Sequence, residues 1–198
     1  MKTGLAICGV GALFAVSCFA GDLEKGVALH ARKDYAEAVT AFRQAAASGN
    51  AEAQRRLGFM YYHGEGAAQD NKRAVTLFES AAKAGDAESA RNLGTMYEYG
   101  MSVEQSDAVA AAWYVTAAEL GEPNSQFAAS IMYYKAQGVA RDRVEAAKWW
   151  TVAMAQGPQW ERRFRPTVES AEAKLTADEN AEGKRRAAQW LKVHGAIE

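Results

Sequence analysis

Small and aromatic residues recur at helical spacing in the middle of the chain. Three of them share one face of a first predicted helix, at positions i, i+1 and i+4: Leu57, Gly58 and Tyr61. Four more share one face of a second predicted helix: Ala74, Phe78, Ala81 and Ala82. The stretch His-Gly-Glu-Gly at residues 63–66 separates the two and breaks a helix. We therefore predict two helices joined by a loop, with Asp70 or Asn71 as the N-cap of the second.

This pattern repeats with a period of 36 residues. Residues 87–122 match residues 51–86 at 13 of 36 positions without a gap, and residues 123–158 form a third copy. Such a period is typical of repeat proteins whose units stack on one another and bury a shared core. In each copy we expect the two helices to be joined by a loop, near residues 64–70, 100–106 and 136–142.

The third copy departs from the first two. Ala129 and Ser130 replace the Leu-Gly pair, and Ala136 replaces the first glycine of the loop. Gly138 and Asp142 keep the frame of the repeat. Glycine adopts a positive φ at little cost and alanine does not, so we expect the third loop to differ most from the others.

The segment before the repeats, residues 21–50, has a shorter spacing. Gly26 and Ala38 are 12 residues apart, whereas the equivalent glycine and alanine of the first 36-residue copy are 16 apart. We predict a helix pair here too, joined by a tight turn at Asp34 and Tyr35.

The segment after the repeats, residues 159–198, has lost their signature. Pro166 is expected to start a new segment because proline disfavours a helix interior. Thr176 and Glu179 form a capping-box pattern, so we predict a helix from there towards His194. Two apolar residues supply its buried side: Trp190 and Leu191. Because the ends of a repeat array need a polar outer face, we interpret residues 159–198 as C-terminal capping helices.

Composition supports a helical fold. The 198 residues include 43 alanines and only three prolines, which makes an all-β protein untenable. We predict an all-α fold, an α-solenoid of about nine helices in antiparallel pairs. Lys plus Arg is 23 and Asp plus Glu is 24, giving a formal net charge of -1. This balance argues against nucleic acid as a partner, because binding to phosphates needs a basic surplus.

The N-terminus has the pattern of a secretory signal peptide. Lys2 precedes an uncharged run at residues 5–20, which is shorter than the ~20 residues of a membrane-spanning helix. We predict a signal peptide at residues 1–20, with cleavage after Ala20, and an exported, periplasmic protein; an uncleaved anchor is the alternative. Ala-Val-Ser before Cys18 also resembles a bacterial lipobox, which would lipidate Cys18. Cleavage after Ala20 would remove both cysteines, Cys8 and Cys18, so no disulfide is expected.

The repeats resemble the Sel-one-like repeat (SLR) family, a branch of the tetratricopeptide superfamily, in its exported bacterial type. The resemblance covers residues 51–158 and rests on five features: the Leu-Gly-x-Met-Tyr box, the glycine-containing loop, the Asp before the second helix, the Ala-x-x-x-aromatic-x-x-Ala-Ala run and the terminal Gly. The shorter unit at residues 21–50 looks like an ordinary tetratricopeptide helix pair. The resemblance implies an adaptor that mediates protein–protein interaction through its concave face.

In a tetratricopeptide-like unit the first helix lines the concave groove. Counting from its glycine, or from Ser130 in the third copy, the positions three before, one after and four after avoid the packing face. They predict nine protein-binding residues: Arg55, Phe59, Tyr62, Arg91, Thr95, Glu98, Phe127, Ile131 and Tyr134. Arginines and aromatics suit an extended peptide or a partner helix. The alternative for Phe127 and Ile131 is core packing between units.

No catalytic, cofactor or metal motif is present in the sequence. The three histidines, His30, His63 and His194, do not occur in a metal-ligand spacing. Arg162, Arg163 and Arg165 are interpreted as part of a solvated face near the cap. An envelope lipoprotein subunit of a secretion or polysaccharide complex is an alternative function. A β-lactamase-like hydrolase is a remote one, since the chain contains no cysteine after residue 20.

Overall fold

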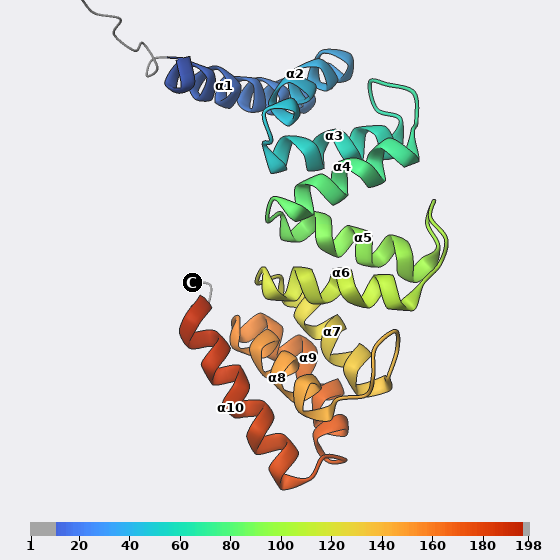
Figure 1. Ribbon diagram of the computed structural model, residues 1–198, viewed down its shortest axis with the longest axis vertical. Coiled ribbons are helices and arrows are strands. Elements are labelled where there is room, and N and C mark those ends of the chain that lie inside the picture. Colours follow the sequence, from blue (N-terminus) through green and yellow to red (C-terminus); the bar gives the residue numbers. More distant parts are fainter. Residues whose placement is uncertain (1–10, 196–198) are drawn as a thin grey trace, which may run out of the picture. The chain divides into compact units, whose positions relative to one another are not determined.

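The computed structural model describes the backbone of residues 11–195 and the side chains of residues 21–195. The chain divides into two compact units, Met1–Ala84 and Gly85–Glu198. Within residues 11–195 there are ten helices and no strand, so the predicted all-α solenoid class is confirmed (Figure 1). This number is close to the expected number of about nine, and the last two helices, which include the expected capping helix, follow the repeats.

The first unit consists of two helix pairs. Its helices are α1 (Gly11–Ala31), α2 (Tyr35–Ala47), α3 (Ala51–His63) and α4 (Asn71–Lys83). Helix α1 packs on α2, and α3 packs on α4. Helix α1 begins inside the predicted signal peptide and continues past Ala20. Lys2 and Cys8 lie outside the described residues, and the signal peptide stays a prediction.

The second unit continues the pairs and then ends differently. Its helices are α5 (Ala87–Tyr99), α6 (Asp107–Glu119), α7 (Pro123–Lys135), α8 (Arg143–Ala155), α9 (Pro158–Glu172) and α10 (Ala177–His194). Helix α5 packs on α6, and α7 packs on α8. The loops inside the three repeats occupy residues 64–70, 100–106 and 136–142, as predicted.

Within each pair, a small residue of the first helix lets an aromatic ring of the second approach the backbone. Gly26 meets Phe42, Gly58 meets Phe78, and Gly94 meets Tyr114. A Cβ atom on these glycines would lie 2.6, 2.8 and 2.9 Å from the nearest ring atom, closer than real Cβ contacts. In the third repeat the position holds Ser130, which is fully buried and donates its hydroxyl hydrogen to the Phe127 carbonyl at 2.6 Å.

Polar side chains begin the helices of the repeats. The N-cap side chains accept a backbone N–H of the first helical turn, and Asp70 does so rather than Asn71. The other caps of this kind are Asn50, Asp86, Ser106, Glu122 and Asp142. Because these bonds satisfy amides that lack an intrahelical acceptor, they fix where each helix starts.

The first loop residue has the same conformation in all three repeats. Gly64, Gly100 and Ala136 have φ values of 71°, 66° and 60°, and each amide donates to the carbonyl of a methionine four residues earlier. At this position the third loop therefore does not differ from the others, although it lacks glycine. The helix C-terminal bond outweighs the strain of a left-handed alanine, which is about 1–2 kcal/mol.

The second loop glycine has a different role, because it touches the preceding helix pair. A Cβ atom on Gly66 would overlap the backbone of Tyr35 at the start of α2, and one on Gly138 would overlap the backbone of Asp107 at the start of α6. Ser102 occupies the equivalent position of the second repeat with a φ of 67°. The left-handed conformation alone therefore does not require glycine there, and the requirement at Gly138 comes from the close approach to Asp107.

The expected segment boundary at Pro166 is wrong. Pro166 lies inside α9, which continues to Glu172. The proline leaves the Arg162 carbonyl without its usual donor, and both residues are exposed, so water can take that place. Helix α9 also continues the 36-residue frame: it occupies the position of the first helix of a fourth unit.

Helix α10 does not complete that fourth unit. It packs along α8 instead of pairing with α9 as the second helices of the repeats pair with the first (Figure 1). The close approach is made at Gly183, where a Cβ atom would overlap the Ala147 side chain. The expectation of antiparallel pairs throughout is therefore wrong for α9 and α10.

The capping helix itself follows the prediction. The Glu179 amide donates to the Thr176 hydroxyl at 3.1 Å, and the Thr176 amide donates to the Glu179 carboxylate at 2.8 Å. Trp190 is buried, its ring meets the Trp149 ring edge-on at 5.9 Å, and its Nε1 donates to Glu119 at 2.8 Å. Leu191 is partly buried against the same cluster.

Replacing Gly94 with Leu should destabilise the second unit. The new side chain would occupy the space of the Tyr114 ring, and overpacking of this kind costs ~1–3 kcal/mol or more. Chemical denaturation followed by circular dichroism measures the change. An unchanged free energy of unfolding would contradict the proposed packing role of this glycine.

A second stability prediction separates strain from close approach. Gly100→Ala should cost about 1–2 kcal/mol, because it only places alanine in the conformation that Ala136 already has. Gly138→Ala should cost ~1–3 kcal/mol more, because its Cβ also overlaps the Asp107 backbone. Equal losses in the same denaturation experiment would show that the loop does not need this contact.

Candidate functional site

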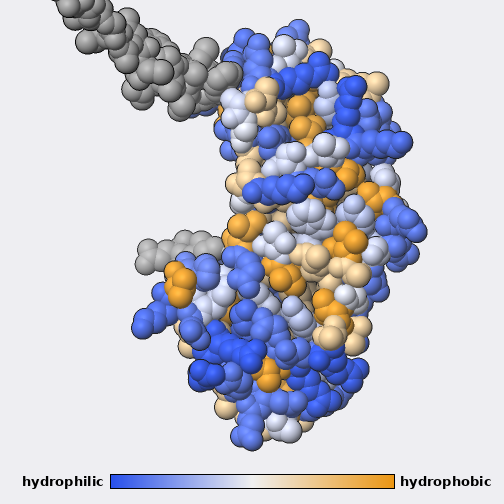
Figure 2. Space-filling model, in the orientation of Figure 1, coloured by the Kyte–Doolittle hydropathy of each residue, from blue (hydrophilic) through white to orange (hydrophobic). Residues whose placement is uncertain are grey.

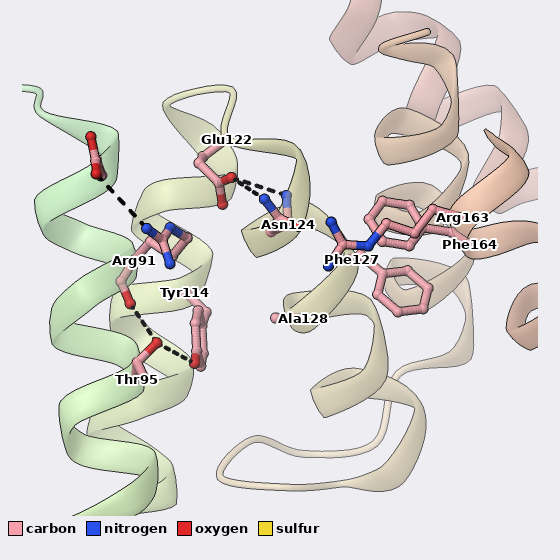
Figure 3. Close-up of a pocket in the computed structure, with 10 residues that line it drawn as sticks. Arg91, Thr95, Tyr114, Glu122, Asn124, Phe127, Ala128, Arg163 and Phe164 are labelled. Carbon is pink, nitrogen blue, oxygen red and sulfur yellow. Dashed lines mark hydrogen bonds and ion pairs between the residues drawn. The ribbon is translucent and has the colours of Figure 1, made fainter. Parts of the chain in front are cut away.

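The second unit contains an open groove of about 800 Å³ beside α7. Helices α5, α6, α7 and α9 and the turn before α7 contribute its residues. They are Glu88, Arg91, Thr95, Tyr114, Glu122, Asn124, Phe127, Ala128, Arg163 and Phe164. Figure 3 shows Arg91 reaching this space from α5 and Arg163 from α9, on either side of α7. The groove therefore has one cation on each side of α7.

One wall is held by a chain of hydrogen bonds. The Tyr114 hydroxyl donates to the Glu98 carboxylate at 2.7 Å and lies 3.0 Å from the Thr95 hydroxyl. Burial raises the pKa of Tyr114 above its usual value of 10, and the bond to Glu98 raises it further, against an opposing effect of Thr95. Tyr114 therefore stays neutral and fixes this wall. Glu98 is used within the wall and does not line the groove.

The aromatic surface is formed by two helices of the second unit. The Phe127 ring of α7 stacks on the Phe164 ring of α9, with centroids 4.1 Å apart and an interplanar angle of 5°. The Trp160 ring also stacks on the Phe164 ring, with centroids 5.7 Å apart. Phe127 is partly buried and packs against the core cluster that contains Phe164. It thus serves the core, as the alternative interpretation held, and it also lines the groove.

The carboxylates of the groove already have partners. Glu122 caps α7 and accepts from the amides of Asn124 and Ser125 at 3.2 and 2.6 Å. Glu88 lies 4.0 Å from Arg91. The Arg163 guanidinium lies over the Trp160 and Phe164 rings at 5.7 and 5.6 Å, and no carboxylate of the described residues pairs with it. Arg163 is therefore the cation available to a negatively charged ligand.

Three of the nine predicted binding residues line the groove: Arg91, Thr95 and Phe127. In the first unit, the Phe59 ring meets the Phe78 ring at 5.1 Å, so it serves packing. Tyr62 contacts the His63 ring at 5.1 Å, and Arg55 is partly buried on the same helix. In the third repeat, the Tyr134 ring lies 6.2 Å from the Trp150 ring, and Ile131 is partly buried. The binding role of these five residues and of Glu98 stays a prediction.

Arg163 and Phe164 were not among the predicted binding residues. The sequence pattern instead assigns Arg163, together with Arg162 and Arg165, to a solvated face. The repeat frame could have identified Arg163. It lies 72 residues after Arg91 and 36 after Phe127, three residues before Pro166, and Pro166 stands where the first two repeats have glycine. The frame is not evident there because Pro166 suggests a break between two segments.

The described residues also bear on two other kinds of interaction, with a membrane and with a metal ion. On the face shown in Figure 2, hydrophobic residues occur in small spots within a largely hydrophilic surface. None of the described helices combines the length and apolar character needed to cross a membrane. In the described part of the chain, His, Cys, Asp and Glu side chains do not gather in groups of three that could hold a metal ion.

The comparison with known proteins agrees with this architecture. The Sel1 repeat family matches residues 51–86, 87–122 and 123–158, which together make up more than half of the chain. The chain therefore belongs to the Sel1 repeat family. Proteins of this family generally mediate protein–protein interaction and are generally non-catalytic scaffolds.

Two solved structures are similar to the chain. The crystal structure of a Sel1 repeat protein from Oxalobacter formigenes has 33% identity and a TM-score of 0.59, and the match covers 63% of this chain and 95% of that one. The second is c5321, a protective antigen of uropathogenic Escherichia coli strains with an SLR fold. It has 23% identity and a TM-score of 0.50, over 88% of this chain and 45% of that one. No curated protein matches the chain.

The neutral state of Tyr114 gives a pH prediction. Its pKa is raised in the folded state, so its contribution is complete below pH 10 and is lost as the unfolded chain ionises above that pH. Relative to Tyr114→Phe, the wild type should lose up to about 1.4 kcal/mol of stability per pH unit above pH 10. Denaturation of both proteins between pH 8 and 11 measures this, and a constant difference would contradict it.

Proposed function

We propose that the protein is an exported adaptor that binds a segment of a partner protein in the groove of its second unit. The single observation that supports this most is the combination of Arg163, which lacks a carboxylate partner among the described residues, with the stacked Phe127 and Phe164 rings. The first helices of consecutive units contribute most of its lining residues, which supports the interpretation of this groove as the predicted concave face. The family's general role in protein interaction supports the same class of function.

The chemistry of the groove suggests the kind of segment. Arginine binds a carboxylate in bidentate fashion, and Arg163 offers such a guanidinium group, with Arg91 and its partner Glu88 on the other side of the groove. The edges and faces of aromatic rings suit an apolar side chain, and aromatic residues commonly anchor interfaces. Thr95 and Asn124 add polar atoms along the groove. An extended peptide or a partner helix with an acidic residue near an apolar one would satisfy these groups.

Export is part of this proposal and rests on the sequence. Residues 1–20 have the charge, length and small-residue exit of a signal peptide, which supports export of the mature chain to the periplasm. The lipobox-like residues before Cys18 support a second candidate, an envelope lipoprotein subunit. Determining the N-terminus of the protein from cells separates them, because cleavage starts the chain at Gly21 and lipidation starts it at Cys18.

The groove can be tested with a displayed library of random heptapeptides selected on the immobilised chain. Peptides selected on the wild type should be rich in Asp or Glu and in large apolar residues. Arg163→Glu should weaken their binding about tenfold or more, because it reverses the charge that faces the ligand. Isothermal titration with the selected peptides measures the change.

Arg162→Glu is the matched control. Arg162 is the neighbouring residue on α9, it is exposed, and it does not line the groove, so its charge reversal should change the affinity less than about twofold. Equal losses in the two variants, or peptides without acidic residues, would move the binding site away from this groove.

A further inference from the structure

The first unit has a separate pocket of about 520 Å³ between α2, α3 and α4. Its residues are Arg43, Leu57, Tyr61, Lys72, Arg73, Thr76 and Leu77. Three of these are cations, and none is a carboxylate. The predicted binding residues of the first unit, Arg55, Phe59 and Tyr62, are not among them, so this pocket is distinct from the predicted groove positions.

Tyr61 organises the cations of the pocket. The Arg43 guanidinium donates to the Tyr61 hydroxyl through Nε at 3.0 Å and through Nη2 at 2.6 Å. Arg43 and Arg73 also lie over the Tyr61 ring, at 5.8 and 5.5 Å from its centroid. Tyr61 is 5% exposed, so the ring holds both guanidinium groups against a fixed surface. The pocket thus presents two positioned arginines rather than two freely moving ones.

In the described part of the chain, a single carboxylate pairs with these cations. Asp70 pairs with Arg73 at 3.1 Å and also caps α4. Among the described residues, no carboxylate pairs with Arg43 or Lys72. The pocket therefore carries a net positive charge that its own surroundings leave unbalanced.

The fold does not require these cations. In the 36-residue frame, the positions of Lys72 and Arg73 hold Ala108 and Val109 in the second repeat. In the third repeat they hold Val144 and Glu145. Arg43 corresponds in the same way to Glu79 in α4 and to Val115 in α6. The same helix pairs form in those repeats without a basic cluster, so the cluster is specific to the first unit.

Apolar side chains complete the pocket. Leu57 is 3% exposed and Leu77 is partly buried, and both line the space beside the cations. A ligand that fills the pocket must therefore offer negative charge next to an apolar group. A simple anion would leave the leucines uncovered, and an apolar ligand alone would leave Arg43 and Lys72 unpaired.

We propose that this basic pocket is a second docking site, for an acidic segment of a partner protein that carries an apolar side chain between its carboxylates. A membrane surface fits less well. Basic clusters that bind anionic lipid contain about four to eight Lys or Arg residues. The pocket has three, and residues 21–84 as a whole carry nine Lys or Arg against eight Asp or Glu.

The test uses a fluorescein-labelled peptide, Gly-Glu-Glu-Leu-Leu-Asp-Glu-Gly, with an amidated C-terminus. Its binding is measured by fluorescence anisotropy to the full chain carrying Arg163→Glu, which removes the proposed contribution of the groove in the second unit. In that background, Lys72→Glu should weaken binding roughly fivefold or more, because it reverses a charge that faces the peptide. Replacing both leucines of the peptide with alanine should weaken it roughly threefold.

Lys83→Glu is the matched control, since Lys83 lies on the same helix, is exposed and does not line the pocket. It should change the affinity less than about twofold. Equal losses for Lys72→Glu and Lys83→Glu, or no saturable binding of the peptide, would overturn the proposal. Binding to vesicles of phosphatidylglycerol that depends on Lys72, without binding of the peptide, would also overturn it and point to a membrane surface. Because the background lacks Arg163, a failure of the groove proposal leaves these outcomes unchanged.

Discussion

The architecture depends on how closely the two helices of each pair approach one another. Gly26, Gly58 and Gly94 each leave room for an aromatic ring of the partner helix, and a methyl group at any of them would force that ring away. This contact fixes the rotation of the first helix about its own axis. A position three residues before the glycine then lies on the flank of this contact, and from there Arg91 lines the groove. Packing and binding surface are thus set by the same residue spacing.

Local signals in the sequence predicted most of the repeat architecture. The loop positions and the Asp70 cap followed from glycine and aspartate at fixed spacing, because such residues act on the backbone within a few positions. The docking of α10 could not be predicted in this way. It depends on Gly183 fitting against Ala147, a contact between residues 36 apart in sequence, and a lone glycine within a charged helix gives no sign of its partner. Ala136 is a case in which the local preference of a residue misleads. Alanine prefers a negative φ, but the hydrogen bond from its amide at the end of α7 holds it at a positive one.

The binding residues were harder to predict than the fold. Of the positions chosen from the frame, Arg91, Thr95 and Phe127 line the groove, but Phe59 lies on an equivalent position and packs on Phe78. Whether such a position faces a groove or a core depends on the size of the neighbouring side chains, which the spacing does not encode. The C-terminal segment adds a second lesson. Helix α9 has lost the repeat signature yet contributes Arg163 to the groove, so a capping element also serves the candidate site.

The division into two units has a consequence for spectroscopy of this protein. All five tryptophans occur between residues 113 and 190, so they belong to the second unit, and the first unit has none. Intrinsic tryptophan fluorescence therefore reports on α5 to α10 alone, whereas the far-ultraviolet circular dichroism signal sums the helices of both units. A denaturation curve recorded by both methods would coincide if the units unfold as one cooperative block and would separate if they do not. The distribution of a single residue type thus gives the chain a built-in probe of cooperativity between its two halves.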